Sequence, residues 1–378
     1  MYRKKAYAFF LILLIIILSA CKAQTVSLST EESAESVESP TAEVMADQTA
    51  DEASEDAAPE EEVDNPDTFH VVTLHSATID ANWDKAFVQA MERVIDLKPH
   101  GLTIVHEIVE SVPWADAERI MKDYAATGEY DLIFIPGLFR DEACATAAAY
   151  PDQLITITTN REGYDCYEAG KNLYVFDSSN LGYCGYLVGA LAGLTTESNL
   201  IAATAPFPST DINEPLNAFI EGAESVNPDV KVTITFIESW YDPPLARDAA
   251  EAQLNIGADF VWALVDGAFE VVEENGAKAA GLYIDQNYLA EDTIVTSAVA
   301  LWDRYFLDSI DVWWENQING TPYSGPEVAI GYTISDGVCD LVIDEDLVSQ
   351  EVIDQIANIK SQLVDGTLQI EITDELPE

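Results

Sequence analysis

Basic residues are scarce in this sequence of 378 residues. Lysine and arginine together number 17, against 68 aspartates and glutamates, which gives a formal net charge of -51 at pH 7. A protein that binds nucleic acid needs a basic face to neutralise phosphates, and a surface as acidic as this one repels them. We therefore expect no nucleic-acid partner.

The motifs of common catalytic and metal sites are also lacking. The sequence has no GxSxG, no Walker loop, no dinucleotide-binding fingerprint and no HExxH, and its five cysteines form no CxxC and no zinc spacing. Carboxylates are so numerous that a chance pair carries no catalytic meaning. We expect no catalytic residue, no metal and no cofactor. The alternative is a hydrolase that uses carboxylates of a cleft, and turnover of the bound solute would reveal it.

The N-terminus has the features of a lipoprotein signal peptide. The basic start MYRKKAY is followed by the apolar run AFFLILLIIIL and then by LSAC at 18–21. The run is short for a membrane span, and it is followed by small residues. LSAC resembles a bacterial lipobox, which implies that residues 1–20 are removed and that the sulfur of Cys21 is lipidated. Acyl chains would then hold the protein on the extracytoplasmic face of the cell membrane; an uncleaved anchor is the alternative.

Residues 22–68 contain no aromatic residue. They hold 15 acidic residues and one lysine among serine, threonine, alanine and proline. Such a segment cannot bury enough apolar surface to offset the entropy of ordering. We expect residues 21–68 to form an acidic, disordered tether behind the lipidated cysteine, and a folded domain to begin near Phe69.

Past Phe69, short apolar runs alternate with helical patterns. HVVTLH is followed by WDKAFVQAMERVIDL, LTIVHEIV by WADAERIMKDYAAT, and DLIFIP by DEACATAAAY; after NLYVFD the alternation resumes with GYLVGALAGL and NLIAATAPF. Near-continuously apolar strands that alternate with amphipathic helices indicate parallel sheets covered on both faces. Two such sheets in succession predict a two-lobed α/β protein.

Ligands of doubly wound sheets bind beyond the carboxyl ends of the strands, where loops and helix N-termini converge. The residues that we predict at these ends are His75 to Trp83, Ser111 to Trp114, Pro136 and Gly137, Phe207 to Asp211, Trp240 to Asp242, Asp266 and Tyr283, with Trp302 further along the chain. A single tryptophan at such a place is commonly a plug of the sheet edge. Three together favour a ligand cleft.

The stretch VKVTITF (231–237) is an alternating strand pattern that ends just before Trp240, Tyr241 and Asp242. The alternation predicts that one ring faces the cleft and the other the lobe interior, and we assign the cleft to Trp240. Asp242 is predicted to cap a helix that starts at about Pro243.

Four cysteines remain after Cys21, so three pairings are open if all four are oxidised. We expect Cys184, which stands among small residues, to be a buried thiol. Cys144 and Cys166 lie in adjacent loop-like stretches and are the predicted disulfide.

Residues 186–292 resemble a known family. NPDVKV, SWYDP, GAD and DQNYLA occur in the order and spacing of the basic membrane protein family of ABC-transporter substrate-binding lipoproteins, whose best-known members are purine nucleoside receptors. The likeness continues in ISDGVCDL (334–341) and in the terminal IKSQLVDGTLQI, so it covers the chain from Phe69 on. It implies a type I periplasmic-binding-protein fold, with two Rossmann-like lobes joined by three crossovers and a ligand cleft between them.

The resemblance also implies domain limits. The solute-binding domain spans 69–378, with lobe 1 at about 69–180 plus 296–322 and lobe 2 at about 181–292 plus 323–378. The crossovers are expected near 176–181, between about 288 and 300, and near 320–325.

NWDKAF, SVPWADAERIM, SWYDP and ALWDRYF resemble members of the family that hold a purine base between aromatic rings. This implies Trp83, Trp240 and Trp302 as walls of the site. The remaining candidate ligand-binding residues are Asp80, Asp84, Phe207, Asp266 and Tyr283. The aspartates would accept hydrogen bonds, although an acid at a helix start can equally be a cap.

Two positions depart from the family's nucleoside-binding pattern. Tyr283 replaces an acid of G-x-D-x-D-Q, and Ala300 stands where many relatives have a lysine. These departures favour a free base or another flat ligand over recognition of ribose. We predict a lipid-anchored, extracytoplasmic receptor that delivers a purine base or nucleoside to the permease and ATPase subunits of an ABC importer. The alternative is a sensing lipoprotein of the same fold that acts in signalling.

Overall fold

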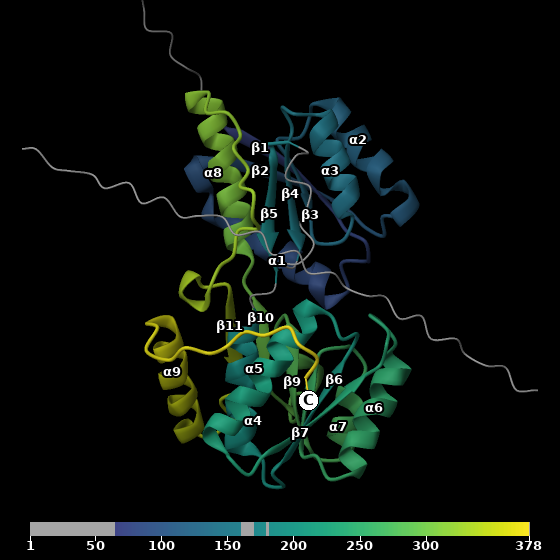
Figure 1. Cartoon of the computed structure of the whole chain (residues 1–378), viewed down its shortest axis with the longest axis vertical. Helices are drawn as coiled ribbons and strands as arrows, with labels where there is room; N and C mark the ends of the chain where they lie inside the picture. Colours follow the sequence, from purple (N-terminus) through teal and green to yellow (C-terminus); the bar gives the residue numbers. More distant parts are fainter. Residues whose placement is uncertain (1–64, 160–169, 179–180, 378) are drawn as a thin grey trace, which may run out of the picture. The chain divides into compact units, whose positions relative to one another are not determined.

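The computed structural model describes residues 65–159, 170–178 and 181–377. The predicted signal peptide, the predicted lipidation site Cys21 and most of the predicted tether lie outside these residues. Two β-sheets organise the described chain, and helices cover both faces of each sheet (Figure 1). No helix in these ranges combines the length and the apolar composition that crossing a membrane requires.

The first sheet contains five parallel strands in the order β2-β1-β3-β4-β5. Helices α2 and α3 pack on one of its faces and α1 and α8 on the other. Burial from both sides explains why a strand such as β3 is apolar at every position. The strands are β1 (Thr68–Leu74), β2 (Thr103–Val109), β3 (Leu132–Ile135), β4 (Leu154–Thr159) and β5 (Leu173–Asp177), and the helices are α1 (Asn82–Leu97), α2 (Ala117–Thr127), α3 (Arg140–Ala149) and α8 (Asp303–Asn319).

The second sheet has the order β11-β10-β9-β8-β6-β7. Its strands are parallel except β11, which runs antiparallel to β10 at the edge. Figure 1 shows α4, α5 and α9 on one side of this sheet and α6 and α7 on the other. The strands are β6 (Leu200–Ala205), β7 (Lys231–Phe236), β8 (Phe260–Ala263), β9 (Lys278–Tyr283), β10 (Ile294–Ala300) and β11 (Cys339–Ile343), and the helices are α4 (Gly182–Thr195), α5 (Thr210–Val226), α6 (Pro243–Asn255), α7 (Phe269–Glu274) and α9 (Gln350–Val364).

The two sheets repeat one strand order. The order β7-β6-β8-β9-β10 of the second sheet matches β2-β1-β3-β4-β5 of the first, so β6 corresponds to β1 and β7 to β2. The chain passes between the sheets after β5, after β10 and before β11. All three connections therefore leave from the β5 and β10 ends, and β2 and β7 lie at the opposite ends of their sheets. This two-lobed α/β architecture confirms the predicted fold class.

Two of the expected lobe limits differ from the strand pairing. Residues 296–300 were expected in lobe 1, but they belong to β10, which pairs with β9 and β11 of the second sheet. Residues from 323 on were expected in lobe 2, but the N–H of Ile330 donates to the carbonyl oxygen of Val175 in β5 at 2.8 Å. An apolar pattern identifies a strand without saying which sheet it joins, because pairing over long sequence distances decides that.

A disulfide bond joins Cys184 of α4 to Cys339 at the start of β11. The expectation of a free thiol at Cys184 was therefore wrong, although the side chain is fully buried as expected. The partner is 155 residues away in the sequence, and the return of the chain into the second sheet as β11 brings it close. Cys144 is disulfide-bonded as well; its predicted partner, Cys166, lies outside the described residues.

Candidate functional site

Trp83 lies where side chains of the two lobes meet. It is in the first turn of α1, and its Nε1 donates a 2.7 Å hydrogen bond to the carbonyl oxygen of Pro136, just after β3. Strands β1 and β3 flank the point at which the strand order reverses, where ligands of such sheets bind. The ring packs edge to face on Tyr283, at the end of β9 in the second lobe, with centroids 5.3 Å apart, and on Trp302, in the crossover before α8, at 4.7 Å. Three predicted site residues thus form one aromatic cluster.

A hydrogen bond joins the lobes beside this cluster. Asn82 opens α1, and its Nδ2 donates to Oδ1 of Asp266, in the loop after β8, at 2.5 Å. Burial raises the pKa of Asp266 above its ordinary value, and hydrogen bonds from Asn82 and Gln286 partly oppose this rise. Asp266 was a predicted site residue. Asn82 lies in the predicted strand-end range His75 to Trp83 but was not among the candidate ligand-binding residues, because an asparagine at the start of a helix is typical of a cap.

Trp302 forms the buried side of the aromatic cluster. Its side chain is fully buried and stacks on Phe87 with ring centroids 4.0 Å apart and an interplanar angle of 24°. Tyr305, the third residue of α8, contacts both rings, with its centroid 6.4 Å from that of Trp302 and 6.5 Å from that of Phe87. In this structure Trp302 is a core residue on which Trp83 packs, rather than an exposed wall of a cleft.

Two buried polar atoms near Trp83 have no hydrogen-bond partner among the described residues. They are Nε1 of Trp302 and Oγ1 of Thr158, near the end of β4. A Cβ atom added to Gly137 would lie 3.5 Å from the Trp83 ring and 3.7 Å from Oγ1 of Thr158, so these two side chains are neighbours. Buried polar groups in native proteins are normally bonded. Thr158 was missed because a threonine in an apolar strand looks like a core residue.

The second lobe brings a phenol and two acids to the cluster. Tyr283 has a left-handed backbone, with φ 72°. Burial raises the pKa of its phenol well above the ordinary value, and the nearby Asp211 adds to the rise, so the hydroxyl stays protonated. Burial also raises the pKa of Asp211, in the first turn of α5. Because the charge of Asp211 and of Asp266 is poorly solvated, these acids favour a ligand that donates hydrogen bonds.

Asp84 is engaged inside the first lobe. It is buried, and its Oδ1 accepts a hydrogen bond from Nδ1 of the fully buried His75 at 2.8 Å. Nε2 of His75 lies 3.0 Å from Oγ1 of Thr73, which in turn lies 2.8 Å from Nε2 of His106. Burial lowers the pKa of His106 to about 4, with a contribution from His75. Asp84 therefore anchors an internal chain of hydrogen bonds and is not a free acceptor.

Trp240 and Tyr241 both project into solvent after β7. Their exposed fractions are 59% and 68%. Trp240 packs on the half-buried Phe207, which follows β6, with centroids 5.2 Å apart. The prediction that Tyr241 faces the lobe interior is wrong, because the left-handed residue Glu238, with φ 53°, interrupts the strand alternation before either ring.

The helix start after these rings agrees with the prediction. Helix α6 begins at Pro243, and Oδ1 of Asp242 accepts a hydrogen bond from the backbone N–H of Leu245 at 3.1 Å. Asp242 is thus a helix cap. Asp80, another candidate, is exposed in the loop before α1.

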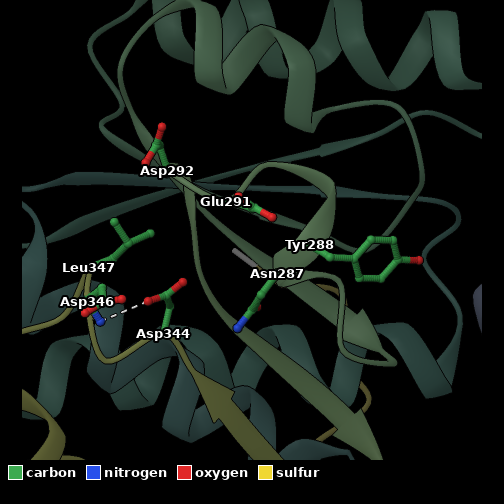
Figure 2. A pocket seen from close by; sticks show the side chains of 7 residues that line it. All are labelled: Asn287, Tyr288, Glu291, Asp292, Asp344, Asp346 and Leu347. Carbon is green, nitrogen blue, oxygen red and sulfur yellow. Dashed lines mark hydrogen bonds between the residues drawn. The ribbon is translucent and has the colours of Figure 1, made fainter.

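A separate hollow of about 410 Å³ lies near the start of β10 and the end of β11. Figure 2 shows that the ring of Tyr288 points away from its carboxylates, and Oδ1 of Asp344 accepts the backbone N–H of Asp346 at 2.9 Å. Within the described ranges, no group of three or more histidines, cysteines or acids is arranged to hold a metal ion. The hollow lies away from the carboxyl ends of the parallel strands, so we do not assign the solute to it. It is lined by Asn287, Tyr288, Glu291, Asp292, Asp344, Asp346 and Leu347.

Residues 69–374 match a family described as ABC transporter substrate-binding protein PnrA-like. The chain is 28% identical over 314 residues to the putative ABC transporter glucose-binding protein TsgA13 of Haloferax volcanii, a match that covers 77% of this chain and 71% of that protein. It is 28% identical over 248 residues to the purine-binding protein BAB2_0673 of Brucella abortus, covering 63% and 67%. It is 27% identical to the transcriptional activator protein med of Bacillus subtilis, covering 56% and 62%.

Among solved structures, the fold is similar to that of an ABC transporter solute-binding protein from Conexibacter woesei. The TM-score is 0.66 at 17% sequence identity, and the superposition covers 80% of this chain and 99% of that chain. At this identity the likeness concerns the fold alone. It agrees with the two lobes and the repeated strand order.

Proposed function

Because the chain belongs to the PnrA-like family of ABC transporter substrate-binding proteins, we propose that it is the extracytoplasmic solute receptor of an ABC importer, anchored through a lipid on Cys21. It captures one small flat solute, a purine base or nucleoside, by closure of the two lobes. It then delivers the solute to the permease and ATPase subunits and carries out no covalent chemistry.

The observation that carries this proposal is the meeting of the lobes at Trp83. The indole of Trp83 in one lobe contacts the phenol of Tyr283 in the other, with ring centroids 5.3 Å apart. The Asn82–Asp266 hydrogen bond joins the lobes at the same place. A receptor that closes around its ligand needs residues of both lobes at one point, and a flat ring is well bound by aromatic faces. Trp240 extends the aromatic surface on the second lobe, because its ring is exposed and supported by Phe207.

Polar groups near these rings suit a ligand such as a purine. Asp211 and Asp266 would accept hydrogen bonds from ring N–H and amino groups, and the hydroxyl of Tyr283 would donate to a ring nitrogen. The purine-binding relative from Brucella abortus supports this assignment. The relative from Haloferax volcanii is named for glucose, so glucose belongs among the solutes to be compared.

Calorimetric titration of the purified protein with adenine, adenosine, guanosine and glucose tests the proposal. We expect one purine to bind at one site per chain, and Trp83→Ala to weaken it by ~1 to 3 kcal/mol through the lost stacking. Trp314→Ala is the matched control, because that tryptophan stacks on His100, away from the strand ends. Tight binding of glucose with no binding of any purine would overturn the purine assignment and leave the receptor class standing.

A second function is favoured by the relative from Bacillus subtilis, which is named a transcriptional activator. On this proposal the same lobes bind a solute and the protein signals instead of transporting. Uptake of the bound solute by cells that lack the gene separates the two functions. Lost uptake supports the importer, whereas normal uptake with altered gene expression supports the signalling protein.

A further inference from the structure

The loops after β2 and β7 are equivalent in the two lobes. The two strands occupy the same place in the repeated strand order. A left-handed residue stands two positions after each strand, Ser111 with φ 54° in the first lobe and Glu238 with φ 53° in the second. Three residues further on stand Trp114 and Tyr241. Both lobes thus place an aromatic residue at the same position of the same turn.

Both rings are exposed to solvent. Trp114 is 58% exposed and Tyr241 is 68% exposed. Trp114 rests edge to face on the buried Phe139, after β3, with centroids 5.4 Å apart, and Leu138 beside it is 52% exposed. An exposed indole held in place by a buried ring is a preformed contact surface, since little side-chain freedom is left to lose on binding.

Their position in the fold sets these two rings apart from the cluster at Trp83. The three connections between the lobes leave from the β5 and β10 ends of the sheets, whereas β2 and β7 are at the opposite ends. Trp114 and Tyr241 therefore lie on the edge of their lobes that is farthest from the connections, and we call this edge the lip of the lobe. When two lobes close about such connections, the lips move the most.

Backbone strain is concentrated at the same edge. Eight non-glycine residues have a positive φ in the described ranges. Four of them, Ser111, Leu138, Phe139 and Glu238, come just after a strand, and Tyr283 is the last residue of β9. Such conformations are costly and collect at ligand clamps, where the surrounding fold maintains them. Phe139 is the residue on which Trp114 rests.

We propose that Trp114 and Tyr241 form an outer aromatic clamp that takes a second ring of the solute, beyond the ring held at Trp83. This rests on the proposed function and narrows the solute to a molecule of two linked ring systems. Acids are close to each ring along the chain, Glu110 and Asp116 near Trp114 and Glu238 and Asp242 near Tyr241, and of these Asp116 pairs with Arg119 at 3.2 Å. They disfavour a phosphate at this end of the solute.

The first test is independent of the solute. In the full chain with both Trp114→Cys and Tyr241→Cys, a short bismaleimide should link the two cysteines. The link is detected after proteolysis between the lobes, because the linked fragments migrate together on a gel. The single variants Trp114→Cys and Tyr241→Cys are the controls. Absence of a link in the double variant, with both thiols reactive toward a monomaleimide, would show that the rings do not face each other and would overturn the clamp.

The second test compares probes that differ by one ring. Adenosine is titrated against N6-benzyladenosine, and glucose against phenyl glucoside. For whichever parent compound binds, adenosine or glucose, we expect the added ring to strengthen binding about tenfold. Trp114→Ala or Tyr241→Ala should remove this gain and leave the affinity for the parent compound unchanged. Leu97→Ala and Ile256→Ala are matched controls, because these exposed apolar residues lie at the far ends of α1 and α6.

The outcomes separate the clamp from the proposed function. If neither adenosine nor glucose binds, the proposed solute class is wrong, and the cross-linking experiment alone tests whether the clamp exists. If a parent binds and the added ring gives no gain, or a gain that both alanine variants keep, the clamp is overturned. If the two variants bind every probe normally but transport fails, the lips contact the permease, which also overturns the clamp.

Discussion

The side-chain amide of Asn82 donates a 2.5 Å hydrogen bond to Oδ1 of Asp266 and so joins the first turn of α1 to the loop after β8. The two residues belong to different lobes, and the bond lies beside the contact of Trp83 with Tyr283. A bond of this kind exists only when the lobes are together. It therefore favours the closed form of the protein over an open one.

Asn82→Ala should weaken solute binding about tenfold, because a hydrogen bond to a carboxylate contributes ~1.5 to 3 kcal/mol and the closed form alone contains it. Calorimetry on the solute found to bind measures the effect. Asn319→Ala is the matched control, since its side chain also donates to a carboxylate, that of Glu315, but on the surface of one helix. Equal affinity in both variants would contradict a role of Asn82 in closure.

The buried Asp266 predicts a pH dependence of stability. Its pKa in the folded chain is above the ordinary value of 3.8, so the folded state binds a proton more tightly than the unfolded state does. The free energy of unfolding therefore falls as the pH rises from about 4 through the raised pKa. Asp266→Asn should reduce this fall in urea unfolding experiments.

Asp80→Asn is the control for the pH experiment, because it removes one charge from an exposed loop. It corrects for the general repulsion in a chain with a formal net charge of -51. If both variants follow the pH dependence of the wild type, burial of Asp266 has no measurable effect on stability.

Two tryptophans that look alike in the sequence should respond in opposite ways. Trp240→Ala should change the free energy of unfolding by no more than ~0.5 kcal/mol, because the ring is 59% exposed, and should weaken solute binding by ~1 to 3 kcal/mol. Trp302→Ala should cost ~3 to 5 kcal/mol of stability, because the ring is fully buried against Phe87. Unfolding curves of both variants measure the stability, and titrations measure the affinity for the solute. A Trp240→Ala protein with normal affinity would remove Trp240 from the site.

The N-terminal sequence predicts a lipid anchor. Cys21→Ser should abolish metabolic labelling with palmitate and leave the chain either uncleaved or released from the membrane, because the thiol is the acyl acceptor. Ser19→Thr, which keeps a small residue before the cysteine, is the control and should label normally. Unchanged labelling of Cys21→Ser would refute the lipoprotein assignment.

The sequence predicts the fold well because the two patterns that indicate it, the alternation of strands with helices and the residue types at helix starts, are local in the sequence. Apolar runs and helical patterns alternate from Phe69 on, and the start of α6 at Pro243 with its cap Asp242 follows from residue types that suit those positions. The placement of β10 in the second sheet and the Cys184–Cys339 disulfide depend on pairing between distant segments. No local pattern contains that information.

The site was predictable in part. The ends of strands identify Trp83, Tyr283 and Asp266, because parallel strands deliver their following residues to one edge. The direction of a ring is harder to predict: one left-handed residue, Glu238, was enough to turn Tyr241 outward. Burial separates Trp302 from Trp240, and an indole fits a core as well as it fits a cleft. Asn82 and Thr158 matter through contacts that only the folded chain has.

Mass spectrometry of the intact protein, purified without denaturation, tests the central claim most directly. We predict one small molecule per chain, which is a flat, uncharged heterocycle when it is released and identified, and which is absent from Trp83→Ala prepared in the same way. A protein that carries no solute, and that gives no heat of binding with adenine, adenosine, guanosine or glucose, would contradict the account of this chain as a receptor that closes on a flat ligand.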